Sequence, residues 1–207
     1  MTVRIGCIVE GQGDVVTVPL LIRRIAAELY PELAIDTPRP IRVHRNQVVQ
    51  PNQLEQEVKL AAQKISGQGA IFILLDSDED CPAELGPALL PRALSVCPNL
   101  PIAVVLAKHE FEAWFLAATE SLRGRRGLRN DFDSPDNPEA IRGAKEWLRQ
   151  RMQNGRTYRE TRDQPALAAL FDLEQARQAD SFDKCYRDIV RLLDELRKTS
   201  SLTNEQI

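Results

Sequence analysis

The sequence predicts an α/β protein with a parallel sheet of about four strands flanked by helices, followed by a helical C-terminal half. Short apolar segments rich in β-branched residues, typical of buried strands, lie at 2–9, 70–75 and 101–107. Segments with apolar residues at helical spacing separate them, at 15–30, 51–66 and 82–96. Strands that alternate with helices favour a parallel sheet covered on both faces.

The remaining N-terminal elements follow from local patterns. The turn EGQGD at 10–14 links the first strand to its helix, and PIRVHR at 40–45 alternates apolar and basic residues like a half-exposed strand. Pro51 opens the second helix, and Gly67 and Gly69 end it. Two prolines disturb the helix at 82–96.

After residue 108 the pattern contains helices alone. They are expected at 110–122, 137–152, 164–171 and 181–198, the second with Asn137 as its cap and Pro138 at its first position. We therefore expect an α/β core over 1–118, a helical elaboration packed on it over 119–198, and a flexible tail over 199–207. The segment 123–136, rich in Arg, Gly, Asn and Asp, is expected to be a loop or hinge.

Composition limits the class of protein. The 207 residues are 43% hydrophobic and 28% charged, which is typical of a soluble globular chain. No segment approaches the roughly 20 apolar residues of a membrane span, and the apolar start is too short for a signal peptide. The four cysteines lack metal-ligand spacing and indicate reduced thiols in a cytoplasmic protein. With only two histidines, zinc chemistry based on histidine is poorly supplied.

Acidic residues follow three of the predicted strands. Glu10 ends the first strand, Asp76 and Asp78 end the strand at 70–75, and Glu110 and Glu112 follow the strand at 101–107. Ligands of open parallel sheets bind at the carboxyl ends of the strands, so these acids are expected to converge. Carboxylates that crowd together need water or a cation. Hard cations such as Mg²⁺ and Mn²⁺ prefer oxygen ligands, so Glu10, Asp76 and Asp78 are the candidate metal ligands.

Spacing refines these assignments. In an extended chain, Asp76 and Asp78 would point to the same side. At the start of a helix, residues two apart lie about 200° around the axis, so only one of Glu110 and Glu112 can face the site. We expect Glu110, which is closer to the strand, and expect Glu112 to pair with Lys108.

Other motifs are weaker. GQG lacks the third glycine of a dinucleotide fingerprint, because Val16 stands there, and no Gly-Lys-Ser/Thr phosphate loop is present. Glu79 and Asp80 are expected to be solvated loop residues or favourable charges at a helix N-terminus. Trp114 and Phe115 are expected in the core.

Several motifs together resemble a known family. Glu10 in CIVEGQGD, followed by Asp-x-Asp in LLDSDED, resembles a TOPRIM domain, the Rossmann-like catalytic fold of topoisomerases, primases and the overcoming-lysogenization-defect nucleases. HEFEAWFLA, TYRETRDQPAL and SFDKCYRDI, in that order, extend the resemblance to an uncharacterised bacterial TOPRIM-like family over nearly the whole chain.

The resemblance implies Mg²⁺-dependent chemistry at a phosphodiester. Glu10 would be a general base or a ligand of a second metal, and Asp76 and Asp78 would hold Mg²⁺. Glu110 would match an extra nuclease acid, and Lys184 either stabilises transition-state charge or is an exposed lysine on an amphipathic helix. No tyrosine is placed as a topoisomerase nucleophile, and Tyr158 is expected to stack or pack. Some relatives carry an ATPase, so a separate ATPase partner in phage defence is possible.

Charge is unevenly distributed along the chain. The net charge is −3, yet residues 123–162 contain eleven Arg or Lys and six Asp or Glu, a local +5. This region either binds nucleic-acid phosphates or forms a solvated helical face. Arg156, Arg159 and Arg162 recur every three residues and are the candidate phosphate contacts.

The same motifs are compatible with other functions. A glycosyltransferase also uses Asp-x-Asp after a strand to hold Mn²⁺ and a sugar nucleotide, and a receiver domain uses acids at the ends of strands. A TOPRIM-like module that binds nucleic acid or a protein without cutting is the non-enzymatic alternative. The sequence does not distinguish DNA from RNA, one metal from two, or a monomer from an oligomer.

Overall fold

A computed structural model describes the backbone of residues 2–204 and the side chains of residues 2–199. The sheet contains five strands, one more than expected, in the order β2-β1-β4-β5 with β3 paired to β1. All pairings are parallel. The strands are β1 (Thr2–Val9), β2 (Ala34–Asp36), β3 (Ile41–Arg42), β4 (Ala70–Asp76) and β5 (Ile102–Ala107). The predicted α/β class is confirmed.

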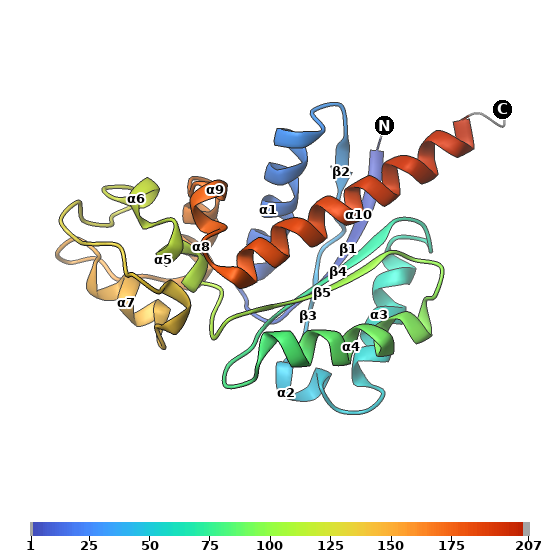
Figure 1. The fold of residues 1–207 in the computed structure, drawn as a ribbon, viewed down its shortest axis with the longest axis horizontal. Coiled ribbons are helices and arrows are strands. Elements are labelled where there is room, and N and C mark those ends of the chain that lie inside the picture. Colours follow the sequence, from blue (N-terminus) through green and yellow to red (C-terminus); the bar gives the residue numbers. More distant parts are fainter. Residues whose placement is uncertain (1, 205–207) are drawn as a thin grey trace.

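The helices cover both faces of this sheet (Figure 1). In the first half of the chain they are α1 (Asp14–Leu29), α2 (Arg45–Val48), α3 (Gln53–Lys64) and α4 (Pro82–Val96). In the second half they are α5 (Ala113–Ala117), α6 (Thr119–Leu122), α7 (Ala144–Gln150), α8 (Glu160–Ala168), α9 (Leu173–Ala176) and α10 (Asp180–Asn204), with a 3₁₀ turn at Pro138–Ala140.

Alternation along the strands divides the core into two clusters. In β4, Phe72 and Leu74 face the cluster that contains α1 and α10, whereas Ile71 and Ile73 face the cluster with α3 and α4. Both sides are apolar because helices cover both faces of a parallel sheet. Side chains from 3 to 196 contribute to the first cluster, so the N-terminal core and the helical half share one hydrophobic interior.

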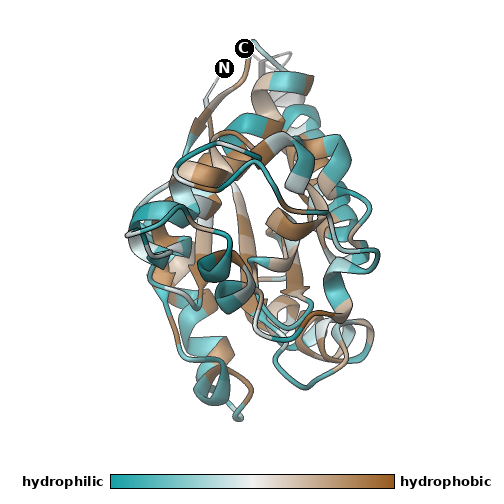
Figure 2. Cartoon of the chain, turned by 90° about the vertical axis from the view of Figure 1, so that its left-hand side faces the viewer, coloured by the Kyte–Doolittle hydropathy of each residue, from teal (hydrophilic) through white to brown (hydrophobic). Residues whose placement is uncertain are grey.

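The short helices α5 to α9 extend beyond one end of the sheet (Figure 1). Figure 2 faces this end and shows hydrophobic segments inside and hydrophilic residues over the outer loops and helices. Aromatic contacts tie this end to the core: the rings of Trp114 and Phe182 lie 5.1 Å apart, and those of Phe115 and Phe171 lie 5.5 Å apart. Edge-to-face pairs of this kind stabilise the packing beyond area burial alone.

Several predicted element boundaries were wrong. The helix expected at 110–122 is divided into α5 and α6, because Ala118 leaves helical geometry with φ −101° and ψ 25°. The helix expected at 137–152 is divided as well. Asn137 caps only the 3₁₀ turn, by accepting a hydrogen bond from the Ala140 amide at 3.2 Å, and Gly143 with φ +74° precedes α7. A single helix cannot pass through that left-handed residue.

Two further differences from the prediction concern the strand β2 and the C-terminal tail. The strand β2 was missed because three residues give too little alternation to recognise. The tail expected to be flexible from residue 199 begins as the last turns of α10, which reaches Asn204. The rest of the predicted tail, residues 205–207, lies outside the described residues.

Candidate functional site

Glu10 and Asp76 lie side by side where β1 and β4 end. The amide of Asp76 donates a hydrogen bond to Glu10 Oε2 at 3.3 Å, and the amide of Arg45 donates to Glu10 Oε1 at 3.3 Å. The amide of Phe111, beyond β5, donates to Asp76 Oδ1 at 2.9 Å. Three parallel strands thus bring their carboxyl ends together, as the position of the acids in the sequence predicts.

Asp78 pairs with Arg45 rather than extending the strand, although its charge still acts on Glu10. β4 ends at Asp76, and Asp78 has a φ of +48°, so the alternation of an extended strand does not reach it. Its carboxylate is 58% exposed and lies 3.7 Å from the Arg45 guanidinium, which also pairs with Asp80. The expectation that Asp76 and Asp78 share a face because both are extended was therefore wrong, and the role of Asp78 as a ligand stays a prediction.

Three more carboxylates approach the strand ends from the helices. They are Asp14 at the start of α1, Glu112 just before α5, and Glu160 at the start of α8. Together with Glu10 and Asp76 they form what we call the acid cluster, which consists of Glu10, Asp14, Asp76, Glu112 and Glu160.

Lys145, from α7, supplies the positive charge of the acid cluster. Its Nζ lies 3.5 Å from Glu112 Oε2, 3.8 Å from Glu160 Oε2 and 3.9 Å from Asp76 Oδ2. The backbone amide of Lys145 also donates to Glu110 Oε2 at 2.9 Å, which fixes the start of α7 against the end of β5. One lysine therefore faces three acids, and its own helix is anchored by a fourth.

Asp14 and α8 close the other side of the cluster. Asp14 is 3% exposed, and it accepts hydrogen bonds from the Gly11 amide at 2.8 Å and from Gln164 Nε2 at 2.7 Å. A Cβ at Gly13 would lie 1.7 Å from Gln164 Oε1, so a larger residue there would force the α8 side chains to move. The glycines of the EGQGD turn thus serve helix packing and hydrogen bonding around the acids.

Glu112, not Glu110, is buried in the acid cluster. Glu112 is 0% exposed, Tyr158 Oη donates to its Oε1 at 2.8 Å, and its Oε2 has no hydrogen-bond partner among the described side chains. The expected pairing of Glu112 with Lys108 was wrong, because the chain turns before α5 and carries Glu112 inward towards Lys145. Tyr158 was expected either to stack or to pack, and it is buried in the interior.

Burial dominates the electrostatics of the cluster. Desolvation raises the pKa of Glu10, of Asp14 and, most strongly, of Asp76, whose charged neighbours Asp14, Glu112 and Glu10 raise it further. Burial also raises the pKa of Glu112 to about 7, against the opposing effects of Lys145 and of the Tyr158 hydrogen bond. These carboxyl groups hold their protons more tightly than ordinary acids do.

The pKa of Lys145 is also raised, but by its charged neighbours and against the effect of burial. Burial alone would lower the pKa of its ammonium, but Glu112, Asp76, Glu160 and Glu110 together outweigh burial and raise that pKa. The lysine therefore stays charged, and it neutralises only part of the surrounding negative charge. The cluster as a whole favours the arrival of another positive charge.

The other predicted site residues lie elsewhere. Lys184, on α10, pairs with Asp188 one turn further along, and no carboxylate of the acid cluster pairs with it in the described part of the chain. Arg162 binds Asp163 through two hydrogen bonds of 2.7 and 2.8 Å. Arg156 and Arg159 precede α8, so the three arginines do not share one helical face.

The residues fit a hard cation in donor chemistry and in number. All atoms offered are carboxylate oxygens, and Mg²⁺ is often held by one or two carboxylates with waters and substrate phosphates. Glu10 and Asp76 are such a pair. Among the described residues, no three Asp, Glu, His or Cys side chains are already arranged around one point as a metal site. A cation here would have these two protein ligands as its core.

The sequence contained signals for only part of this cluster. Asp14 stands four residues after Glu10, in the segment predicted only as the turn EGQGD. Lys145 and Glu160 lie in the helical half, where no sequence pattern ties a residue to the ends of distant strands. Only the tertiary packing of α7 and α8 against the sheet identifies them.

No helix in the described part of the chain is both long and apolar enough to cross a membrane.

Fold and site define an α/β protein with a parallel sheet, whose carboxyl edge carries a partly neutralised group of acids. The chain belongs to the family described as a domain of unknown function (DUF4276), whose model matches residues 9–189. No curated protein and no solved structure matches the chain significantly.

Proposed function

We propose that this protein is a TOPRIM-like, Mg²⁺- or Mn²⁺-dependent phosphodiesterase that cleaves nucleic acid. The observation that carries the proposal is the pair formed by Glu10 and Asp76 at the ends of adjacent parallel strands, with the surplus of buried acid around it. Such a site attracts a divalent cation, and a cation next to a phosphodiester is the usual means of cleaving it.

Each residue has a role in this proposal. Glu10 and Asp76 would hold the cation, with Asp78 available from the adjoining loop. The cation would polarise a phosphoryl oxygen and lower the pKa of a bound water. Glu110 anchors α7 through the Lys145 amide, and so positions the lysine beside the acids.

Lys145 takes the electrostatic role that the resemblance implied for Lys184. Its side chain is 34% exposed and its ammonium lies within 4 Å of Asp76, so it can contact an anion brought to the strand ends. A positive charge fixed beside a transferring phosphoryl group stabilises the charge that develops on its oxygens. Without substrate, the same charge keeps Asp76, Glu112 and Glu160 together.

The biological setting belongs to the same proposal. The four cysteines, at 7, 81, 97 and 185, are free thiols and suit the reducing cytoplasm, where we place the protein. The resemblance suggests a separately encoded ATPase as a partner, with phage defence as the context. The local charge of +5 over residues 123–162 supports a polyanionic substrate.

A cleavage assay tests the proposal. End-labelled single- and double-stranded DNA and RNA are incubated with the protein in Mg²⁺, in Mn²⁺ and in EDTA. We expect cleavage in at least one metal, none in EDTA, and none with Asp76→Asn.

Asp36→Asn is the matched control. Asp36 makes an exposed ion pair with Arg4 at the opposite end of β1, so the same chemical change leaves the carboxyl ends of the strands intact. Absence of cleavage of all four substrates in both metals would favour a non-catalytic binding module. Equal activity of the Asp76→Asn and Asp36→Asn proteins would place the chemistry elsewhere.

A further inference from the structure

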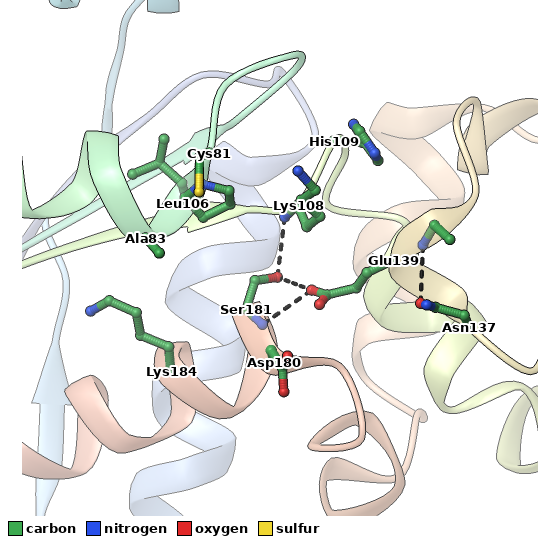
Figure 3. A pocket seen from close by; sticks show the side chains of 12 residues that line it. Cys81, Ala83, Leu106, Lys108, His109, Asn137, Glu139, Asp180, Ser181 and Lys184 are labelled. Carbon is green, nitrogen blue, oxygen red and sulfur yellow. Dashed lines mark hydrogen bonds between the residues drawn. The ribbon is translucent and has the colours of Figure 1, made fainter.

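A cavity lies between the N-terminal ends of α4 and α10 (Figure 3). Its volume is about 540 Å³, within the range of small-molecule sites. One wall is apolar and is formed by Pro82, Ala83, Leu106 and Ala140. None of the residues that line the cavity is one of the acids to which the proposed cleavage assigns the cation.

Two lysines reach this cavity from different walls. Lys108 directly follows β5, and Lys184 lies in the first turns of α10. Lys184 pairs with Asp188, whereas no carboxylate among side chains 2–199 lies within ion-pair distance of the Lys108 ammonium, although the charge of Lys108 acts on Glu79. Glu139 and Asp180 also line the cavity. An unpaired ammonium beside an apolar wall fits a ligand that combines a flat ring with an anionic group.

The polar floor of the cavity is already ordered. The Ser181 hydroxyl accepts hydrogen bonds from the Lys108 amide at 3.1 Å and from Trp114 Nε1 at 2.8 Å, and it donates to Glu139 Oε1. The Ser181 amide donates to the same oxygen at 3.1 Å (Figure 3). Ser181 thus fixes Glu139 through Oε1. The other oxygen, Oε2, can then accept hydrogen bonds from the N–H donors of a ligand.

We propose that this cavity binds a nucleoside monophosphate unit. The base would lie against the apolar wall, with its N–H groups towards Glu139, and the phosphate would contact Lys108. A sugar phosphate would leave the apolar wall unused, and inorganic phosphate would leave most of the volume empty. The unit is either a free nucleotide or one nucleotide of a strand, since both present the same chemistry.

The cavity and the acid cluster are separated by a shared wall. The Ser77 hydroxyl accepts from the His109 amide at 3.0 Å, and the His109 ring contacts the Asp78 carbonyl at 2.7 Å. His109 lines the cavity, whereas the charge of Asp78 acts on Glu10. A bound nucleotide would thus lie next to the strand ends. Nucleotide binding can be measured without metal, so this site can be tested independently of the proposed cleavage.

The test measures binding in EDTA by titration calorimetry. The four ribonucleoside monophosphates, the matching nucleosides and inorganic phosphate are compared on the parent protein, on Lys108→Ala and on Lys59→Ala. Lys59 is an exposed lysine of α3 and is the matched control. We expect Lys108→Ala to weaken nucleotide binding about tenfold, as expected for loss of a charged hydrogen bond, and to leave nucleoside binding unchanged.

A second readout places the ligand in the cavity. Cys81 lines the cavity and is exposed, whereas Cys7 and Cys185 are buried. In a Cys97→Ser background, saturating nucleotide should slow alkylation of Cys81 by iodoacetamide. Asp76→Asn should keep both nucleotide binding and this protection, so that failure of the proposed cleavage and failure of this site can be told apart.

Several results would overturn the inference. These are no binding of any nucleotide at millimolar concentration, inorganic phosphate that binds as tightly as the nucleotides, equal loss of nucleoside and nucleotide binding in Lys108→Ala, or unprotected Cys81. Short oligonucleotides identify the source of the unit. Tighter binding than the monophosphates indicates a nucleotide of a strand, and weaker binding indicates a free nucleotide; both agree with the site.

Discussion

Replacing Glu112 by Gln should stabilise the protein in a pH-dependent way. Glu112 is fully buried, and burial raises its pKa from the ordinary 4.5 to about 7. In the unfolded chain the carboxyl group ionises near pH 4.5, whereas in the folded chain it keeps its proton until about pH 7. The wild-type protein therefore loses stability as pH rises between these two values. Gln keeps the shape and the acceptor for Tyr158 but cannot ionise.

The magnitude follows from the width of that pH window. One pKa unit corresponds to about 1.4 kcal/mol, so the stability advantage of Glu112→Gln should grow by roughly 2–3 kcal/mol between about pH 5 and pH 8. Loss of the ion pair with Lys145 is already contained in the shifted pKa, because Lys145 is one of its causes. The pH dependence of the difference is thus the informative quantity.

Urea unfolding at several pH values in EDTA measures this difference. Glu57→Gln on α3 is the matched control, since it removes a partly buried carboxylate outside the acid cluster. Unfolding curves of Glu112→Gln and the parent that stay a constant distance apart across the range would refute the reasoning, because they would mean that Glu112 ionises normally in the folded protein.

Further predictions concern Lys145 and the arginines before and within α8. Lys145→Met should lower stability at neutral pH by about 1–3 kcal/mol in chemical denaturation, because three acids lose a shared partner that is only partly exposed; unchanged stability would mean that Lys145 does not hold the cluster together. Replacing Arg156, Arg159 and Arg162 by Ala should lower the slope of log affinity for nucleic acid against log salt by roughly 0.7–0.9 for each phosphate that the variant no longer neutralises. Because Arg162 is hydrogen-bonded to Asp163, the single variant Arg162→Ala should instead lower the melting temperature. Its slope of log affinity against log salt, measured by fluorescence anisotropy, should stay unchanged. If Arg162→Ala changes the slope as much as Arg156→Ala, the ion pair with Asp163 opens on binding.

The sheet and its acidic edge were predictable because they depend on local patterns. Apolar runs locate β1, β4 and β5, and the rule for open parallel sheets then places Glu10 and Asp76 at one edge. Each of these steps uses only residues close together in the sequence and one general property of the fold.

The rest of the site depends on details that the sequence does not display. The extended alternation that paired Asp76 with Asp78 fails at a single left-handed residue, and helical spacing alone cannot say where α5 begins. Lys145 and Glu160 reach the acids from segments far along the chain. Such contacts depend on how helices pack, and patterns along one segment carry no information on them.

Mn²⁺ titration calorimetry of the parent, Asp76→Asn and Asp36→Asn tests most directly whether the acid cluster is a divalent metal site. Divalent metal binding should relieve the repulsion between the buried acids, so we predict saturable binding by the parent and by Asp36→Asn. Asp76→Asn should lose it, because Asp76 supplies one of the two adjacent carboxylates at the ends of β1 and β4. Equal Mn²⁺ affinity in all three proteins would contradict the account and would mean that any metal binds away from the carboxyl ends of β1 and β4.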